Sequence, residues 1–151
     1  MIKKYILCVD DDPDDCSLLH EFLTKYDPDI DISYVSDGQA AIDFLEQSKQ
    51  KSSLPVLVIM DINMPKLSGK DATKIIKKDA VLKILPVVLM STAIKDPDLV
   101  EIEALGAAIL RKPDTLSGYD EIAKTLTSSL KLKKPDAESE VSQAWPLQIN
   151  F

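Results

Sequence analysis

Two short apolar runs in this chain each end in aspartate, and this pattern constrains the fold more than any other feature of the sequence. Residues 6–9 lead directly into Asp10 and Asp11. Residues 56–60 lead directly into Asp61. Strands that are apolar at every position are typical of parallel sheets buried on both faces. Parallel strands end at one edge of the sheet, where open α/β folds bind ligands, so we expect the three acids to meet there.

Three carboxylates in one crevice repel one another. Two unit charges roughly 4 Å apart cost about 4 kcal/mol at an effective dielectric near 20. A hard cation relieves that repulsion, and a site that offers only oxygen ligands suits Mg²⁺ or Mn²⁺. The sequence therefore predicts a site for Mg²⁺ or Mn²⁺ at this edge.

Strand-like and helix-like segments alternate along the whole chain. The expected strands are residues 5–9, 30–35, 56–60, 87–90 and 108–110. The expected helices are residues 13–26, 39–47, 70–78, 97–105 and 118–130, with a polar connection over residues 48–53. This (βα)₅ order predicts an α/β fold, a doubly wound parallel five-stranded sheet with helices on both faces.

The length of 151 residues fits one domain over residues 1–131 and a tail over residues 132–151 without an output domain. The net charge of −7 argues against direct nucleic-acid binding, because no basic stripe is available to neutralise phosphates. No apolar stretch approaches the ~20 residues of a membrane span, and no signal peptide is evident. We expect a cytoplasmic protein with no membrane partner. The apolar end of the tail, residues 145–151, is either a docking segment or a loose terminus.

Several residues in and after the first strand are expected to have structural roles only. Asp12 is expected to cap the first helix, and Asp14 and Asp15 are expected in its solvated first turn. Cys8 and Cys16 have neither zinc-like spacing nor a CxxC pattern. We expect Cys8 to act as a small hydrophobic residue in its strand.

Four motifs at four expected strand ends resemble, in order and spacing, the receiver domain of two-component response regulators. They are Cys8-Val9-Asp10-Asp11-Asp12, Met60-Asp61-Ile62-Asn63-Met64-Pro65 with Gly69, Met90-Ser91-Thr92-Ala93, and Arg111-Lys112-Pro113. The similarity extends over about residues 3–130. Within the family the chain looks most like stand-alone receivers, including those that serve bacterial phytochromes. The resemblance implies the flavodoxin-like receiver fold.

The resemblance implies that Asp61 accepts a phosphoryl group from a sensor histidine kinase or a phosphotransfer protein. A carboxylate is a competent nucleophile in such chemistry, and catalysis is then mostly positioning and charge neutralisation. Asp11 and Asp61 would bind the metal directly. Asn63 would bind it through its backbone carbonyl, and Asp10 through water.

The other two motifs imply a cation and a switch. Lys112 would bring its ammonium to the phosphoryl oxygens as a point charge. Ser91 would turn its hydroxyl toward the phosphate and move the loop that follows; counting from Pro86 places Ser91, not the adjacent Thr92, at this position. Thr92 replaces the small residue usual in the family and is expected to slow loss of the phosphoryl group. Ile109 replaces the usual aromatic residue, so the chain departs from an aromatic-flip readout.

The implied function is a single-domain response regulator that switches a protein-binding surface and is not an enzyme beyond its own phosphorylation and dephosphorylation. Homodimers would form through the fourth helix, fifth strand and fifth helix, residues 97–130. A receiver-like module that is never phosphorylated is one alternative, opposed by the intact set of acids and lysine. An aspartyl-phosphate phosphohydrolase is another, but Asn63 stands where that class usually has a second acid. A flavodoxin-like cofactor binder would need a phosphate loop where residues 10–15 are acidic.

Overall fold

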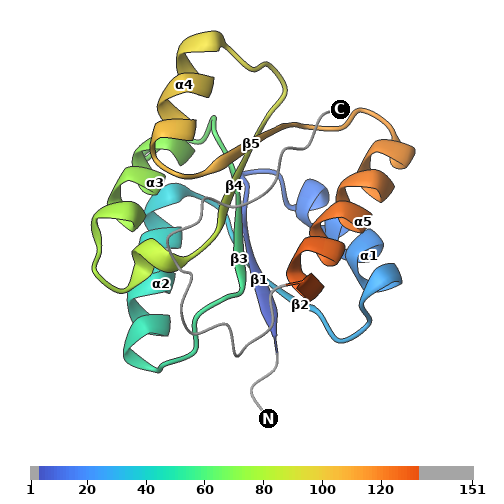
Figure 1. Ribbon diagram of the computed structural model, residues 1–151, viewed down its shortest axis with the longest axis horizontal. Helices are drawn as coiled ribbons and strands as arrows, with labels where there is room; N and C mark the ends of the chain where they lie inside the picture. Colours follow the sequence, from blue (N-terminus) through green and yellow to red (C-terminus); the bar gives the residue numbers. More distant parts are fainter. Residues whose placement is uncertain (1–3, 133–151) are drawn as a thin grey trace.

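The computed structural model describes residues 4–132 of the chain. Its single sheet contains five parallel strands in the order β2-β1-β3-β4-β5. Figure 1 shows α1 and α5 on one face of the sheet and α2, α3 and α4 on the other. The predicted doubly wound α/β fold is confirmed.

The elements have the following bounds. The strands are β1 (Tyr5–Val9), β2 (Asp31–Val35), β3 (Leu57–Asp61), β4 (Val87–Ser91) and β5 (Ala108–Arg111). The helices are α1 (Pro13–Tyr26), α2 (Gly38–Gln50), α3 (Gly69–Lys78), α4 (Asp96–Ala104) and α5 (Leu116–Leu132), with a short 3₁₀ turn, η1 (Leu82–Ile84), that the sequence did not predict.

The largest error in the predicted element ends is in α2. The polar residues after Gln47 were expected to form a connection, but the helix continues to Gln50. Ser48 is buried, and its hydroxyl donates a hydrogen bond to the Phe44 carbonyl oxygen, 2.9 Å away. A serine whose hydroxyl is satisfied one turn back fits inside a helix, so its polarity did not mark a loop.

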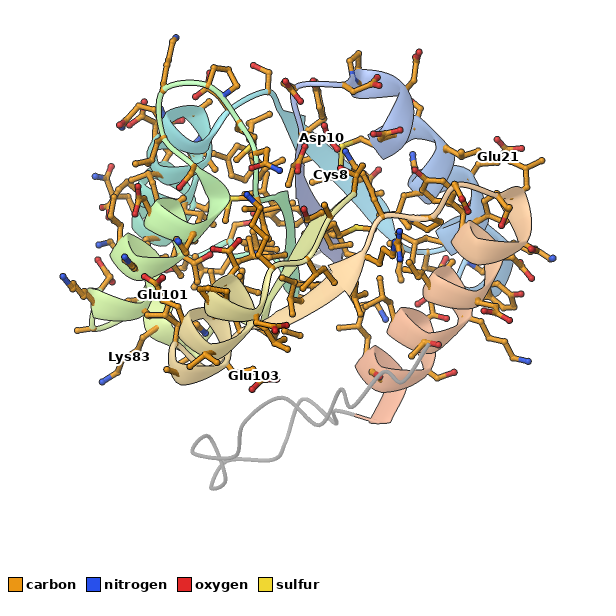
Figure 2. All side chains as sticks on the ribbon, turned by 90° about the horizontal axis from the view of Figure 1, so that it is seen from above. Cys8, Asp10, Glu21, Lys83, Glu101 and Glu103 are labelled. Atoms are coloured by element: carbon orange, nitrogen blue, oxygen red, sulfur yellow. A yellow bond between two sulfur atoms is a disulfide. The ribbon has the colours of Figure 1, made fainter. Side chains whose placement is uncertain are left out.

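Two apolar cores, one on each face of the sheet, hold the strands in place. Leu7 and Val9 of β1 face the core under α2 and α3, whereas Ile6 faces the core under α1 and α5. Burying a side chain of this size contributes about 1.5–3 kcal/mol. In Figure 2, Cys8 and Asp10 lie between the two helix layers.

The register of β1 and β3 places the predicted acids side by side. Val9 pairs with Met60, so Asp10 and Asp61 are the next residues along two neighbouring parallel strands. A one-residue slip would turn every side chain of β1 to the opposite face, and the two buried faces therefore specify this register.

The domain boundary after residue 131 stays a prediction. The tail residues 133–151, including the proposed docking segment, lie outside the described residues. None of the helices within residues 4–132 has the length and apolar character needed to span a membrane.

Candidate functional site

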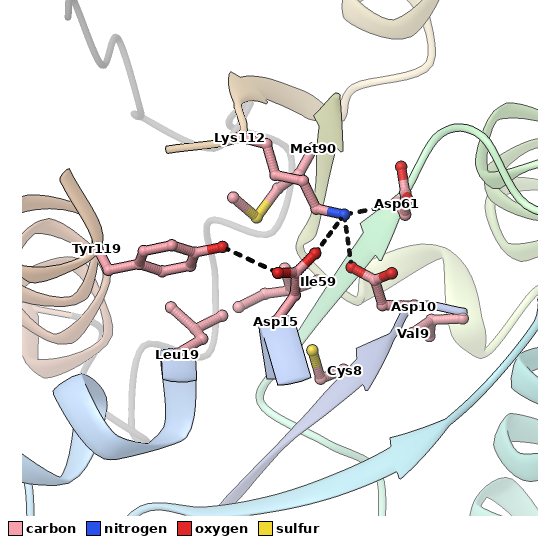
Figure 3. A pocket seen from close by; sticks show the side chains of 10 residues that line it. All are labelled: Cys8, Val9, Asp10, Asp15, Leu19, Ile59, Asp61, Met90, Lys112 and Tyr119. Carbon is pink, nitrogen blue, oxygen red and sulfur yellow. Dashed lines mark hydrogen bonds and ion pairs between the residues drawn. The ribbon is translucent and has the colours of Figure 1, made fainter. Parts of the chain in front are cut away.

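Three predicted metal ligands meet at the carboxyl edge of the sheet. Asp10, Asp11 and Asp61 each offer a carboxylate oxygen, and these oxygens lie within 4.8 Å of one another. Asp10 is 5% exposed and Asp61 is 9% exposed, whereas Asp11 is open to solvent. The cluster therefore has a buried floor and an accessible side; Figure 3 shows Asp10 and Asp61 beside the Lys112 ammonium.

The chemistry of this cluster fits a hard divalent cation. Burial raises the pKa of Asp10 above its ordinary value, although hydrogen bonds from Lys112 and from the Asp12 amide act in the opposite direction. A buried carboxylate whose charged form is disfavoured gains from a nearby positive charge. Oxygen ligands of this kind suit Mg²⁺ and Mn²⁺.

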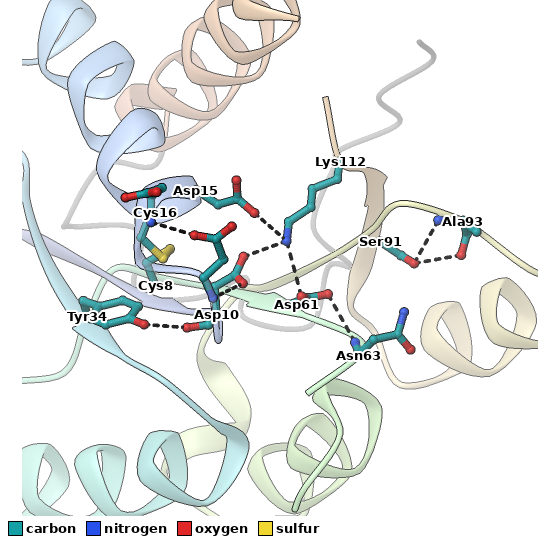
Figure 4. Close-up of polar contacts among 12 residues, drawn as sticks. Cys8, Asp10, Asp15, Cys16, Tyr34, Asp61, Asn63, Ser91, Ala93 and Lys112 are labelled. Atoms are coloured by element: carbon teal, nitrogen blue, oxygen red, sulfur yellow. Dashed lines mark hydrogen bonds and ion pairs between the residues drawn. A yellow bond between two sulfur atoms is a disulfide. The ribbon is translucent and has the colours of Figure 1, made fainter. Parts of the chain in front are cut away.

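Asn63 lies beside the cluster through its backbone. Its amide donates a hydrogen bond to the Asp61 Oδ1 atom, 3.2 Å away, and its side chain is exposed (Figure 4). This bond ties the start of the loop between β3 and α3 to the Asp61 carboxylate. Metal binding through the Asn63 carbonyl stays a prediction.

Lys112 reaches the same crevice from the end of β5. Its backbone amide donates to the Ser91 carbonyl oxygen, 2.8 Å away, which holds this residue beside β4. Its ammonium lies 2.8 Å from Asp10 Oδ2, 2.8 Å from Asp15 Oδ2 and 3.3 Å from Asp61 Oδ2 (Figures 3 and 4). Burial alone would lower the pKa of Lys112, but the hydrogen bonds to Asp10 and Asp15 raise it above its ordinary value, so the ammonium stays charged.

The two candidate switch residues differ in their surroundings. Ser91 ends β4 and is buried; its hydroxyl donates to the Ala93 carbonyl oxygen, 2.7 Å away, and accepts from the Ala93 amide, 3.2 Å away. Figure 4 shows this hydroxyl turned into the loop that leads to α4. Thr92 is exposed. The roles of Ser91 and Thr92 stay predictions.

The expectation that Asp15 is a solvated first-turn residue is wrong. Its side chain is only 30% exposed and forms an ion pair with Lys112. It also accepts a hydrogen bond from the Tyr119 hydroxyl, 3.4 Å away. Asp15 precedes the buried Leu19 by four residues and Leu23 by eight, so it lies on the inward face of α1. That spacing is the signal that could have identified it.

The expectation for Cys8 is half correct. Cys8 is buried in β1 as predicted, but its sulfur forms a disulfide with Cys16 in the first turns of α1. The bridge ties the end of β1 to the helix that carries Asp15. No known cysteine spacing predicts a disulfide between a strand and the helix that follows it, so the sequence offered no signal for this bridge.

Comparison with known proteins agrees with this geometry. The family model described as "Response regulator receiver domain" matches residues 6–119. The response regulator Rcp1 of Synechocystis is 34% identical over 99 residues, which cover 64% of this chain and 67% of that protein. The transcription factor SKN7 of Candida albicans is 34% identical over 142 residues, which cover 93% of this chain but only 24% of that protein.

Solved structures resemble the whole described fold. The phosphorylated cyanobacterial phytochrome response regulator RcpA has a TM-score of 0.77 at 30% identity, covering 85% of this chain and 94% of its own. The Mn²⁺-bound form of the response regulator Rcp1 has a TM-score of 0.73 at 30% identity, covering 83% and 92%.

Proposed function

The chain belongs to the response regulator receiver domain family, and from that membership we propose that it is a phospho-acceptor switch whose acceptor is Asp61. One observation carries the proposal. The Asp61 carboxylate lies 3.3 Å from the Lys112 ammonium, inside a cluster of three carboxylates suited to a divalent cation. Nucleophile, cation and metal ligands are the parts that phosphoryl transfer to a carboxylate requires.

In this mechanism the donor is the phosphohistidine of a sensor histidine kinase or a phosphotransfer protein. An Asp61 Oδ atom attacks phosphorus, the new O–P bond forms, and the N–P bond to the imidazole breaks; the leaving nitrogen takes up a proton. The Lys112 ammonium neutralises charge on the phosphoryl oxygens. Asp11, Asp61 and the Asn63 carbonyl would hold Mg²⁺ or Mn²⁺ directly and Asp10 through water, and the ion would supply further positive charge at those oxygens.

The Ser91 hydroxyl couples phosphorylation to a change of the protein surface. This hydroxyl leaves its partners in the loop after β4 and turns toward the new phosphoryl group, so the loop moves and α4 follows. Thr92, next in sequence and exposed, shields the acyl phosphate from water. Apolar side chains are exposed near this loop and at the start of α5, and these are Ile94, Val100 and Leu116. They support a protein-binding face that could hold a second copy of the chain as a homodimer.

The proposal places the protein in the cytoplasm as a signalling domain, not as an enzyme acting on another substrate. It assigns no direct contact with nucleic acid or membrane. The phosphohydrolase alternative is not favoured, because Asn63 offers no acid two residues after the nucleophile.

The test is phosphorylation by acetyl phosphate or phosphoramidate with Mg²⁺, followed by intact-mass measurement. The wild type should gain one phosphoryl mass, and Asp61→Asn should gain none. Asp14→Asn is the matched control, since it removes an exposed acid of the same type from α1. Equal labelling of Asp61→Asn and the wild type would refute Asp61 as the acceptor. A wild type that takes up no phosphoryl group would favour the unphosphorylated-module alternative.

A further inference from the structure

Lys112 has three carboxylate partners among the described residues, and one of them lies outside the metal cluster. Asp10 and Asp61 belong to the cluster of candidate metal ligands. Asp15 does not, because it lies on α1 rather than at a strand end. Yet Asp15 is as close to the ammonium as Asp10 is, 2.8 Å in each case.

Asp15 is itself held in place from α5. The Tyr119 ring is buried, and its hydroxyl donates to Asp15 Oδ1, while Asp15 Oδ2 accepts from Lys112 (Figure 3). Burial raises the pKa of Tyr119 to about 12, with the Asp15 charge acting in the same direction. The phenol is the donor in this contact, as an ordinary tyrosine hydroxyl is at neutral pH, and the two oxygens of Asp15 have separate partners.

We propose that Asp15 is the positioning residue for Lys112, holding its ammonium beside Asp61 while Tyr119 fixes the Asp15 carboxylate. The inference rests on the proposed phosphoryl transfer to Asp61. Asp15 does not touch the reacting atoms in this scheme. It acts through the lysine.

The reason is competition for charge. A dication held by Asp10 and Asp61 takes up the charge that these carboxylates otherwise offer to Lys112, and it repels the ammonium. Asp15 is then the remaining carboxylate partner of Lys112 within residues 4–132. A lysine carries its charge on a flexible four-carbon stem, so the Lys112 ammonium needs a fixed carboxylate partner to stay at one position.

The kinetic test compares Asp15→Asn with Asp14→Asn. Both substitutions remove one acid from the first turn of α1, but of these two acids only Asp15 forms an ion pair with Lys112 in the described structure. Asp15→Asn should lower the maximal phosphorylation rate at saturating Mg²⁺ about tenfold, the factor expected from one weak charge-assisted hydrogen bond. Asp14→Asn should change it by less than about twofold. Asp15→Glu should restore part of the rate, and Tyr119→Phe should lower it by about two- to threefold.

A second measurement needs neither metal nor phosphoryl donor. The ¹H–¹⁵N signal of the Lys112 ammonium, recorded in EDTA, should shift or broaden in Asp15→Asn and stay unchanged in Asp14→Asn. A purely structural role for Asp15 would lower the melting temperature without this selective change at Lys112. Equal rates in the two variants, or an unchanged Lys112 signal in Asp15→Asn, would overturn the proposal.

The two proposals fail in different ways. If Asp61→Asn is still labelled, the assignment of the acceptor is wrong, whereas the ammonium signal still decides whether Asp15 holds Lys112. If Asp61→Asn abolishes labelling and Asp15→Asn reacts like Asp14→Asn, phosphoryl transfer stands and the positioning role is refuted.

Discussion

Replacing Lys112 by methionine should destabilise the metal-free protein by about 3 kcal/mol. The substitution keeps most of the aliphatic stem and removes the charge. At 2.8 Å, each ion pair with Asp10 or Asp15 has a gross attraction of about 6 kcal/mol at an effective dielectric near 20. The Lys112 side chain is 13% exposed, and the cost of burying its charge offsets much of that gain.

The net loss comes from the carboxylates that remain. Removing one partner of a buried pair costs about 3–5 kcal/mol, because a charge is left buried without compensation. Asp15 can recover water, since it is 30% exposed, but Asp10 and Asp61 cannot do so fully. The low end of that range is therefore appropriate. For a domain of this size it corresponds to a fall in melting temperature of about 10 °C.

Added Mg²⁺ should reverse much of this loss. Without the lysine, Asp10, Asp11 and Asp61 have no ion-pair partner among residues 4–132, so a dication should bind the variant more tightly than the wild type. Tenfold tighter binding would add about 1.4 kcal/mol of stabilisation at saturating metal.

The assay is thermal unfolding followed by circular dichroism in EDTA and in millimolar Mg²⁺. Lys124→Met is the matched control, because Lys124 is an exposed lysine on α5 without an ion pair in the described part of the chain. Lys112→Met should melt lower than Lys124→Met in EDTA and gain more from Mg²⁺ than the wild type gains. The electrostatic reasoning is refuted if the two variants melt together in EDTA, or if Mg²⁺ stabilises the wild type as much as Lys112→Met.

Three further substitutions test other parts of the structure. Asp79→Ala should lower the free energy of unfolding in urea above about pH 4, and its stability should converge with that of the wild type as the pH falls toward 2. Hydrogen bonds from the Leu82 amide and other donors lower the pKa of Asp79 to about 2, so a stability difference that stays constant from pH 7 to 2 would contradict this. Gly69→Ala should cost about 1–3 kcal/mol and slow phosphorylation, since a Cβ atom there would collide with the Asp61 carbonyl oxygen; wild-type melting and labelling would show that the loop adjusts freely. Thr92→Ala should shorten the lifetime of the phosphorylated form, measured by decay of the added mass, and an unchanged lifetime would remove Thr92 from the site.

The parts of this structure that depend on one-dimensional pattern were predictable. The apolar runs before Asp10 and Asp61 identified two central strands, and parallel geometry brought their ends together. Lys112 came instead from the resemblance to receiver domains, and it lies after β5, where it contacts both acids. Strand ends converge by topology alone, so no knowledge of side-chain packing was needed.

The parts that depend on packing between distant helices were not predictable in the same way. Helical spacing could have placed Asp15 on the inward face of α1. Its contacts with Lys112 and Tyr119 depend on the packing of α1 against α5, which the pattern of neither helix reveals. The Cys8–Cys16 disulfide joins a strand to the helix after it. A spacing of eight residues matches no motif, so it was missed.

The helices on the two faces of the sheet differ in how firmly they are packed. Helices α1 and α5 share one large apolar core and also carry Asp15 and Tyr119. Helix α4 lies on the other face, and among its residues Ile102 alone is buried.

Ion pairs also join α4 to the neighbouring helix α3. Lys70 and Lys74 of α3 pair with Asp98 and Glu101 of α4 at distances of 2.7–3.1 Å. Partly exposed pairs of this kind contribute little, about 0–1 kcal/mol each. The least firmly packed helix of the five therefore begins five residues after Ser91. A change in the partners of that hydroxyl would displace α4 at lower cost than it would displace α1 or α5, which are held by their shared core.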